Sequence, residues 1–388
     1  IVFGDWSSDV CSSDLGDDYS SLQRHVSLAI AYNVWEYYHA TGDLDFLKNY
    51  GAEMFLDICR FWAGKAKINP ETGRYSISGV MGPDEFHEQY HGSTEGGLRD
   101  NAYSNIMVVW AIDKAFDILS LLGNSAAEVK NKLKLSDEEL AEWKTISRKL
   151  NIVISEDGII SQYDGYFDLA ELDWDHYRTK YGNIYRLDRI LKAEGKSADE
   201  YKVAKQADTL MAFYNLDDAE VRGILEELGY SVKDSYLKDN LEYYLARTSH
   251  GSTLSRVVHA LLANMIGDRE LSWELYQDAL SSDYNDIQGG TTAEGIHMGV
   301  MASTIIIAMH AFAGLNLRGN EIRINPNLPE KWRSVKFGFE FRRQRFSLSV
   351  DEKNVTFASD AANSQPEKVV ISGRTFEIKP GEVVKTDF

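Results

Sequence analysis

The sequence predicts a mainly α-helical domain followed by a small antiparallel β domain. Apolar residues recur at the 3,4 spacing of helices from Leu22 to about residue 314, and from about Gly319 the period changes to two. Short Gly-Asp and Asp-rich turns join the helical segments, which favours antiparallel neighbours. We therefore divide the 388 residues into a helical domain over 17–318 and a C-terminal β domain over 319–388.

The helical elements follow from the apolar spacing and from the residues that interrupt it. The first helix follows Leu22, and its buried stripe is expected to contain Val26, Ala29, Ile30, Asn33, Val34, Tyr37 and Tyr38. Thr41-Gly42-Asp43 ends that helix and caps the next, expected over 44–63. Further helices are expected over 98–122, 136–151, 202–215, 218–228, 236–245, 252–266, 269–280 and 296–314. Long loops over 64–97, 158–185 and 281–295 separate them, and such loops on a helical scaffold usually hold function.

The tail alternates as strands do. Phe337, Phe339 and Phe341 form one alternating set, and Phe346, Leu348 and Val350 form the next. Shorter strands are expected over 354–358, 368–372, 374–378 and 382–385.

The beginning of the chain has neither period. Asp5 to Leu15 closely resembles a translated sequencing-adapter peptide, so residues 1–16 are left out of the fold prediction as a non-native segment that includes Cys11. We expect the chain to be a fragment that is cut upstream.

Composition excludes several classes of function. With 41 Lys and Arg against 60 Asp and Glu, the formal charge is −19, which disfavours nucleic acid and membrane surfaces as partners. No apolar run approaches the ~18 residues of a membrane span, and no signal peptide is evident. The two cysteines, Cys11 and Cys59, argue against a disulfide framework or a structural zinc site. We expect a cytoplasmic protein.

Glu85 is the leading candidate for chemistry. It lies in Gly82-Pro83-Asp84-Glu85-Phe86-His87, a polar turn beyond a long helical stretch. A carboxylic acid placed in this way can protonate a leaving group. Pro-Asp-Glu is also an ordinary turn and helix-start signal, so the hexapeptide alone leaves both interpretations open.

Three more segments combine polar groups with helices. Lys205-Gln206-Ala207-Asp208 places a cation inside an expected helix, where Lys205 needs a partner such as Asp208 or another acid. The hydroxyl-rich run from Thr248 to Ser255 enters a helix and is typical of an anion site, or of simple capping. The run from Gly289 to His297 also enters a helix, and its Thr-x-Ala-Glu could be a capping box.

Together these segments favour transfer of a sugar to phosphate. One carboxylic acid would protonate the glycosidic oxygen while phosphate attacks the opposite face of the anomeric carbon. A hydrolase would instead need a second carboxylate to activate water.

At these residues the chain resembles glycoside hydrolase family 65, the maltose, kojibiose and trehalose phosphorylases. The similarity runs from about residue 22 to the end, and seven motifs occur in the family's order. They are His39-Ala40-Thr41-Gly42-Asp43, Arg60-Phe61-Trp62-Ala63, Gly82–His87, Asp100-Asn101-Ala102-Tyr103-Ser104-Asn105, Lys205–Asp208, His250–Ser255 and Gly290–His297.

The resemblance implies an (α/α)6 toroid, here incomplete at its N-terminus, followed by the small β domain. It places the general acid on Glu85, and it implies an inverting phosphorolysis of an α-glucosyl disaccharide to β-glucose 1-phosphate and a free acceptor sugar. The implied phosphate site contains Lys205, Gln206, His250, Ser252, Thr253 and Thr291, and the implied sugar site contains Arg60, Trp62, Glu294 and His297. It implies no metal and no organic cofactor; the partners are the disaccharide and inorganic phosphate, and a homodimer is expected of the full-length protein.

The chain departs from the family in two places. The family's Phe-Trp-Asp-Thr-Glu segment is absent, so the toroid as written is expected to expose helix faces meant for burial. The segment from Glu88 to Arg99 is longer and richer in glycine than in better-known members, and because it borders the acceptor site it leaves the acceptor open. A hydrolase of the same family, with Glu294 or another acid as base, and a non-catalytic carbohydrate-binding fragment are the alternatives.

Overall fold

The computed structural model describes residues 19–287 and 292–388. The segment 1–16 and Thr291 therefore lie outside the described residues. Of the helices in these two ranges, none is both long and apolar enough to cross a membrane.

The first layer of the helical domain is built on one long, largely buried helix. In α4 (Ala102–Leu122) nearly every residue up to Ile112 is buried, because α1 (Val26–Thr41), α3 (Ala52–Lys65) and α6 (Asp137–Ser147) all pack against it. Between α1 and α3, α2 (Leu44–Phe46) runs into a π-helical turn over Leu47–Gly51, and α5 (Ala126–Leu133) lies beside α3.

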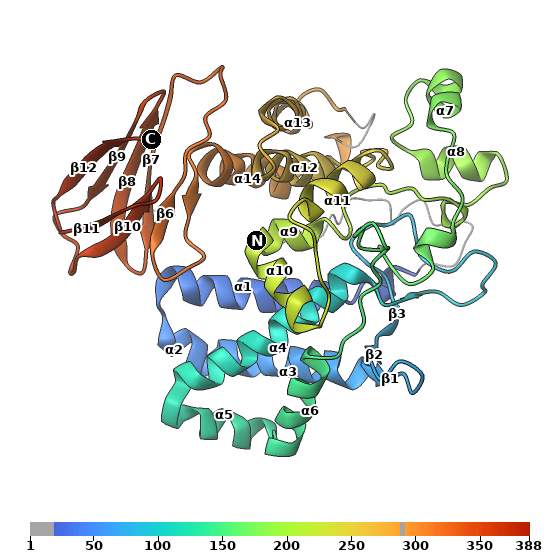
Figure 1. Cartoon of the computed structure of the whole chain (residues 1–388), viewed down its shortest axis with the longest axis horizontal. Coiled ribbons are helices and arrows are strands. Elements are labelled where there is room, and N and C mark those ends of the chain that lie inside the picture. Colours follow the sequence, from blue (N-terminus) through green and yellow to red (C-terminus); the bar gives the residue numbers. More distant parts are fainter. Residues whose placement is uncertain (1–18, 288–291) are drawn as a thin grey trace.

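The second layer is formed by α12 (Thr253–Met265), α13 (Arg269–Ser281) and α14 (Met298–Ile306), which pack on one another. The short α9 (Met211–Asn215) contacts both α4 and α12 and so joins the two layers, with α10 (Asp218–Glu227) and α11 (Tyr236–Leu245) beside it. One continuous apolar core extends through both layers. Figure 1 shows α7 (Trp174–Tyr181) and α8 (Leu187–Ala193) projecting at the side of the molecule opposite to the β domain.

The local signals for several helix ends are confirmed. Gly42 ends α1 at φ +67°, and the Asp43 side chain accepts a hydrogen bond from the Phe46 N–H at 2.9 Å. Ser136 caps α6 through the Glu139 N–H at 3.1 Å. The helices expected over 218–228, 236–245, 252–266 and 269–280 all form.

Two parts of the helix prediction are wrong. Residues 202–210 are not helical and only 211–215 form α9, because the backbone of this segment pairs with residues 247–251 instead. Leu98–Arg99 is a strand, β4, that pairs with β3 (Ser78–Val80), so the helix expected from residue 98 begins at Ala102. The short helices α5, α7 and α8 were not predicted, because a helix of 7 or 8 residues is too short to show a clear apolar period.

The C-terminal domain consists of two four-stranded sheets with an apolar core between them. One sheet has the order β11-β10-β6-β5 and the other the order β12-β9-β8-β7. The strands are β5 (Leu315–Asn316), β6 (Ile322–Ile324), β7 (Ser334–Phe341), β8 (Gln344–Asp351), β9 (Asn354–Ser359), β10 (Glu367–Ile371), β11 (Arg374–Ile378) and β12 (Val383–Asp387). The alternation of β7 and β8 is confirmed, with Phe341, Phe346, Leu348 and Val350 buried. All pairs are antiparallel except β6 with β10, which is parallel, and strands begin at Leu315, slightly before residue 319.

Candidate functional site

The hexapeptide Gly82–His87 lies in the loop between β3 and β4, and its three titratable side chains differ in burial. The Glu85 side chain is 21% exposed, whereas the Asp84 and His87 side chains are 0% exposed. Only Glu85 can therefore reach a substrate. Asp84 and His87 are internal supports of the loop.

Asp84 fixes the loop to the Lys205 segment through its side chain. Its Oδ1 accepts hydrogen bonds from the backbone N–H of Lys205 at 2.7 Å and of Gln206 at 3.3 Å. Its Oδ2 lies 3.4 Å from His87 Nδ1 and accepts from Gln162 Nε2 at 3.3 Å. The Gln206 side-chain amide adds a second link between the two segments by donating to the Pro83 carbonyl at 2.6 Å.

His87 is held between two acceptors. Its Nε2 lies 3.0 Å from the Tyr201 carbonyl, and its Nδ1 faces Asp84. Burial alone would lower the pKa of His87, but the hydrogen bond to Asp84 and the negative charge of that residue outweigh it, so the pKa is raised.

Asp208 completes the connection beneath the loop. Its Oδ2 accepts from the Asp84 N–H at 3.1 Å and its Oδ1 accepts from Asn101 Nδ2 at 2.8 Å. The residue is 4% exposed, and burial raises its pKa to about 7. Gly82 is required at this point, because a Cβ there would lie 2.1 Å from Asp208 Oδ2 and 2.3 Å from Asn101 Nδ2.

Lys205 finds its partner in Glu85 and not in Asp208. The Lys205 Nζ lies 2.8 Å from Glu85 Oε2, and the lysine side chain is only 5% exposed. The structural alternative considered for this lysine, an ion pair with an acid, is therefore realised with the candidate catalytic acid itself.

The hydroxyl-rich segment lies directly beside Lys205. The backbone of residues 204–205 pairs with that of 248–251, through Ser249 N–H to the Ala204 carbonyl at 2.8 Å and Gly251 N–H to the Lys205 carbonyl at 2.9 Å. Ser252 is the N-cap of α12, and Thr253 is the first residue of that helix. Both are buried, and Thr253 Oγ1 is enclosed with no hydrogen-bond partner among residues 19–287 and 292–388. The arrangement directs the start of a 13-residue helix toward the neighbourhood of the lysine, as an anion site requires.

His250 is a neutral imidazole in this arrangement. Its backbone has φ +54°, and its Nδ1 lies 2.9 Å from Ser255 Oγ. Burial, together with the charges of His259 and Arg256, holds the pKa of His250 well below its usual value. The positive charge near it comes from Arg256, whose Nη1 donates to the His250 carbonyl at 3.2 Å.

The last segment is described only in part. Glu294 ends a 3₁₀ helix over Thr292–Glu294, and nothing is described of its side chain. His297 is the N-cap residue of α14, and its Nδ1 lies 2.6 Å from Asp283 Oδ1. The described contacts thus connect His297 to its own loop and do not connect it to Glu85.

Arg60 and Trp62 lie in structural contacts. Arg60 forms an ion pair with Glu139 at 2.7 Å, which joins α3 to α6. Trp62 is 0% exposed and donates from its indole to Ser27 Oγ at 2.9 Å. These contacts lend no support to their assignment to a sugar site, which stays a prediction.

Three contributors to the site were missed by the sequence analysis as functional residues. They are Asp84, which joins the two loops, Asn101, which holds Asp208, and the buried Arg256. Asn101 lies in a motif that carried the family resemblance, so a signal for it existed. Within the described residues, no cluster of three or more His, Cys, Asp and Glu could hold a metal ion.

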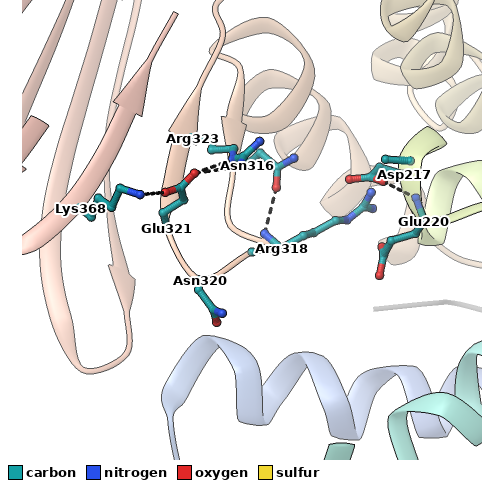
Figure 2. A pocket seen from close by; sticks show the side chains of 10 residues that line it. Asp217, Glu220, Asn316, Arg318, Asn320, Glu321, Arg323 and Lys368 are labelled. Atoms are coloured by element: carbon teal, nitrogen blue, oxygen red, sulfur yellow. Dashed lines mark hydrogen bonds and ion pairs between the residues drawn. The ribbon is translucent and has the colours of Figure 1, made fainter. Parts of the chain in front are cut away.

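A separate cleft of about 630 Å³ lies between α10 and the strands β5 and β6 (Figure 2). Its lining belongs to none of the four segments above and includes Asp217, Glu220, Asn316, Arg318, Glu321 and Lys368. Glu321 is paired with Lys368 at 2.6 Å and with Arg323 at 2.8 Å, so its carboxylate is held between two cations. The same lining contains Glu220, whose pKa is raised by burial, and Arg318.

The fold and these segments agree with what comparison with known proteins shows. Residues 5–306 match the Glycosyl hydrolase family 65 central catalytic domain, and residues 315–378 match the Glycosyl hydrolase family 65, C-terminal domain. The chain belongs to glycoside hydrolase family 65. The mainly helical fold with a C-terminal, mostly antiparallel β domain is thereby confirmed, and it is consistent with an (α/α)6 toroid.

Similar proteins are named as phosphorylases. The chain is 44% identical over 344 residues to a trehalose 6-phosphate phosphorylase of Lactococcus lactis, covering 89% of this chain and 43% of that protein. It is 30% identical over 374 residues to a kojibiose phosphorylase of Halothermothrix orenii, covering 94% of this chain and 44% of that protein. A solved structure of a putative kojibiose phosphorylase from human microbiome superposes with a TM-score of 0.75 at 25% identity, covering 93% of this chain and 49% of that one. The chain thus spans less than half the length of these relatives.

Proposed function

We propose that the site phosphorolyses an α-glucosyl disaccharide with inversion, yielding β-glucose 1-phosphate and a free acceptor sugar. One observation carries this: the exposed carboxylate of the acid loop, Glu85, lies 2.8 Å from the lysine of the anion-binding segment. A hydrolase has no need of a cation and a helix N-terminus beside its acid, whereas a phosphorylase must bring a phosphate to the sugar that its acid protonates. The relatives named as phosphorylases support the same reaction.

The chemical step uses few groups. Glu85, in its protonated form, gives its proton to the glycosidic oxygen as the bond from that oxygen to C1 breaks, and the electron pair of the bond remains on the oxygen. A phosphate oxygen forms the new bond to C1 on the opposite face, so the α-glucoside becomes β-glucose 1-phosphate. Lys205, Gln206, His250, Ser252, Thr253 and Thr291 are proposed to hold the phosphate, and Arg60, Trp62, Glu294 and His297 remain the proposed sugar contacts.

The relatives differ in substrate, so the proposal stops at the class of α-glucosyl disaccharides. We extend it to a cytoplasmic homodimer without metal or organic cofactor. Light scattering coupled to size-exclusion chromatography tests the dimer.

Turnover of a panel of α-glucosyl disaccharides, with and without inorganic phosphate, tests the function. We expect phosphate-dependent release of β-glucose 1-phosphate, and a loss of about 10²–10⁴-fold in kcat for Glu85→Gln. Release of glucose at full rate in phosphate-free buffer would establish the hydrolase alternative. Undetectable turnover by both forms, with unchanged sugar binding, would establish a carbohydrate-binding fragment.

A further inference from the structure

The ion pair between Lys205 and Glu85 conflicts with the proposed chemistry unless it is broken. A carboxylate 2.8 Å from an ammonium group is stabilised in its ionised form. A general acid must instead carry its proton when the substrate arrives. The Lys205 side chain is only 5% exposed, so ions in solvent have little access to its ammonium group while it is paired with Glu85.

The backbones around this pair are fixed, so the lysine side chain is the element that can change partners. Asp84 accepts from the N–H groups of both Lys205 and Gln206, and the Lys205 carbonyl accepts from Gly251. Both loops and the start of α12 therefore keep one relative position. The four-carbon stem of a lysine is flexible enough to move its ammonium group between two acceptors on such a frame.

Resting on the proposed function, we propose that phosphate binding draws the Lys205 ammonium group from Glu85 to the phosphate and thereby protonates Glu85. One proton enters from solvent and converts the Glu85 carboxylate to the carboxylic acid. No other bond changes in this step. Glu85 is thus protonated, and able to act as the general acid, only when the phosphate nucleophile is bound.

The charges around Glu85 agree with this exchange. Lys205 forms an ion pair with Glu85, and Asp84 turns its carboxylate toward the backbone of 205–206 and toward His87. Asp208 lies beneath the same loop, with a pKa raised by burial to about 7. The neutral His250 directly precedes Gly251, and Arg256, on α12, donates to the His250 carbonyl. When a dianion takes the lysine, Glu85 is left beside added negative charge, which favours its neutral form.

The exchange also accounts for selectivity against water. Without phosphate, Glu85 remains ionised in the ion pair and cannot protonate a glycosidic oxygen. Hydrolysis is therefore suppressed at the step of acid catalysis, in addition to any lack of a base for water.

Calorimetric titration with sulfate tests the proposal, because sulfate is a tetrahedral dianion that does not titrate near neutral pH. Measured in buffers of different ionisation enthalpy at pH 6–7.5, the wild-type chain should take up close to one proton per sulfate bound. Glu85→Gln should bind sulfate with no uptake. Because proton uptake and sulfate binding are linked, the affinity of the wild type for sulfate should fall by up to about tenfold for each unit by which the pH rises, over the range in which protons are taken up.

Two lysine variants complete the design. Lys205→Met should bind sulfate at least tenfold more weakly, and its phosphate-free hydrolysis should rise several-fold over the wild type because Glu85 is no longer held as a carboxylate. Lys202→Met is the matched control, since Lys202 lies in the same segment but pairs with Glu171 at 3.5 Å. It should leave proton uptake unchanged.

Sulfate binding by the wild type without proton uptake, or equal uptake by Glu85→Gln, would overturn the proposal. If sulfate does not bind, the difference in uptake between wild type and Glu85→Gln with inorganic phosphate decides in the same way. Absence of binding of both anions would overturn it as well. Phosphate-independent turnover refutes the proposed function, whereas phosphate-dependent turnover without proton uptake refutes only this inference.

Discussion

Replacing Asp208 by Asn should change how the stability of the protein depends on pH. Burial raises the pKa of Asp208 from 3.8 to about 7, so the folded protein holds a proton that the unfolded chain releases above pH 4. At about 1.4 kcal/mol for each tenfold change in proton affinity, this corresponds to about 4 kcal/mol. The group imposes no cost below its unfolded pKa, and stability is lost progressively as the pH rises from about 4 to 7.

Asn resembles the protonated acid and keeps one acceptor oxygen for either the Asp84 N–H or Asn101 Nδ2. Urea unfolding followed by tryptophan fluorescence at pH 5 and pH 7.5 measures the effect. The wild type should lose about 3 kcal/mol more than Asp208→Asn between these values. Asp117→Asn, at a carboxylate that is 54% exposed, serves as the control and should follow the wild type. Parallel pH profiles for wild type and Asp208→Asn, within about 0.5 kcal/mol, would show that Asp208 is ionised in the folded protein and refute the reasoning.

Three glycines provide further predictions. Gly82→Ala should destabilise the protein by about 1–3 kcal/mol, because its Cβ would enter the contact between Asp208 and Asn101. Gly223→Ala in α10, where nothing lies within 4 Å of the added Cβ, should instead stabilise the protein by about 0.5–1 kcal/mol. Thermal unfolding measures both, and equal effects of the two substitutions would contradict this prediction. Gly251→Ala should raise the KM for phosphate about tenfold with a smaller change in the KM for the sugar, because its Cβ would lie 2.2 Å from the Tyr185 carbonyl and displace the segment paired with Lys205; a change confined to the sugar KM would argue against the proposed phosphate site.

The elements that the sequence predicts well are those whose signal is local. Apolar spacing and capping residues locate α1, α10, α12 and α13, and strict alternation fixes β7 and β8. The buried stripe expected of α1 is right only in part, because Ala29 and Val34 are buried whereas Ile30 and Tyr37 are exposed. In these segments the residues that determine the structure lie within a few positions of one another, so the pattern is complete in the sequence itself. The same holds for Gly42, whose left-handed conformation ends α1 where the sequence places the end.

The prediction of a helix over 202–210 is wrong because the contacts that determine this segment are distant in the sequence. Its apolar spacing fits a helix, yet its backbone groups are satisfied by residues 247–251 and by the Asp84 side chain, about 120 positions away. Tertiary hydrogen bonds override a local preference in this case. No window of sequence around Lys205 contains that information.

The site could be predicted only in part, again because its residues are held by loops that are distant in the sequence. Composition and spacing placed Glu85 on a polar turn and Lys205 near an acid, but the choice between Asp84, Glu85 and His87 as the group that meets substrate depends on burial. That burial is imposed by Tyr201, Gln162 and Asp208, which come from other loops. Hence the identity of the lysine's partner, on which the proposed coupling of phosphate binding to proton uptake depends, becomes visible only when the two loops are seen together. The proposed reaction needs a protonated acid and a bound phosphate at the same moment, and a cation that either group can hold couples the two conditions. The hydrogen bonds from the Lys205 backbone to Asp84 and Gly251 keep this lysine where its ammonium group can contact Glu85 or the phosphate.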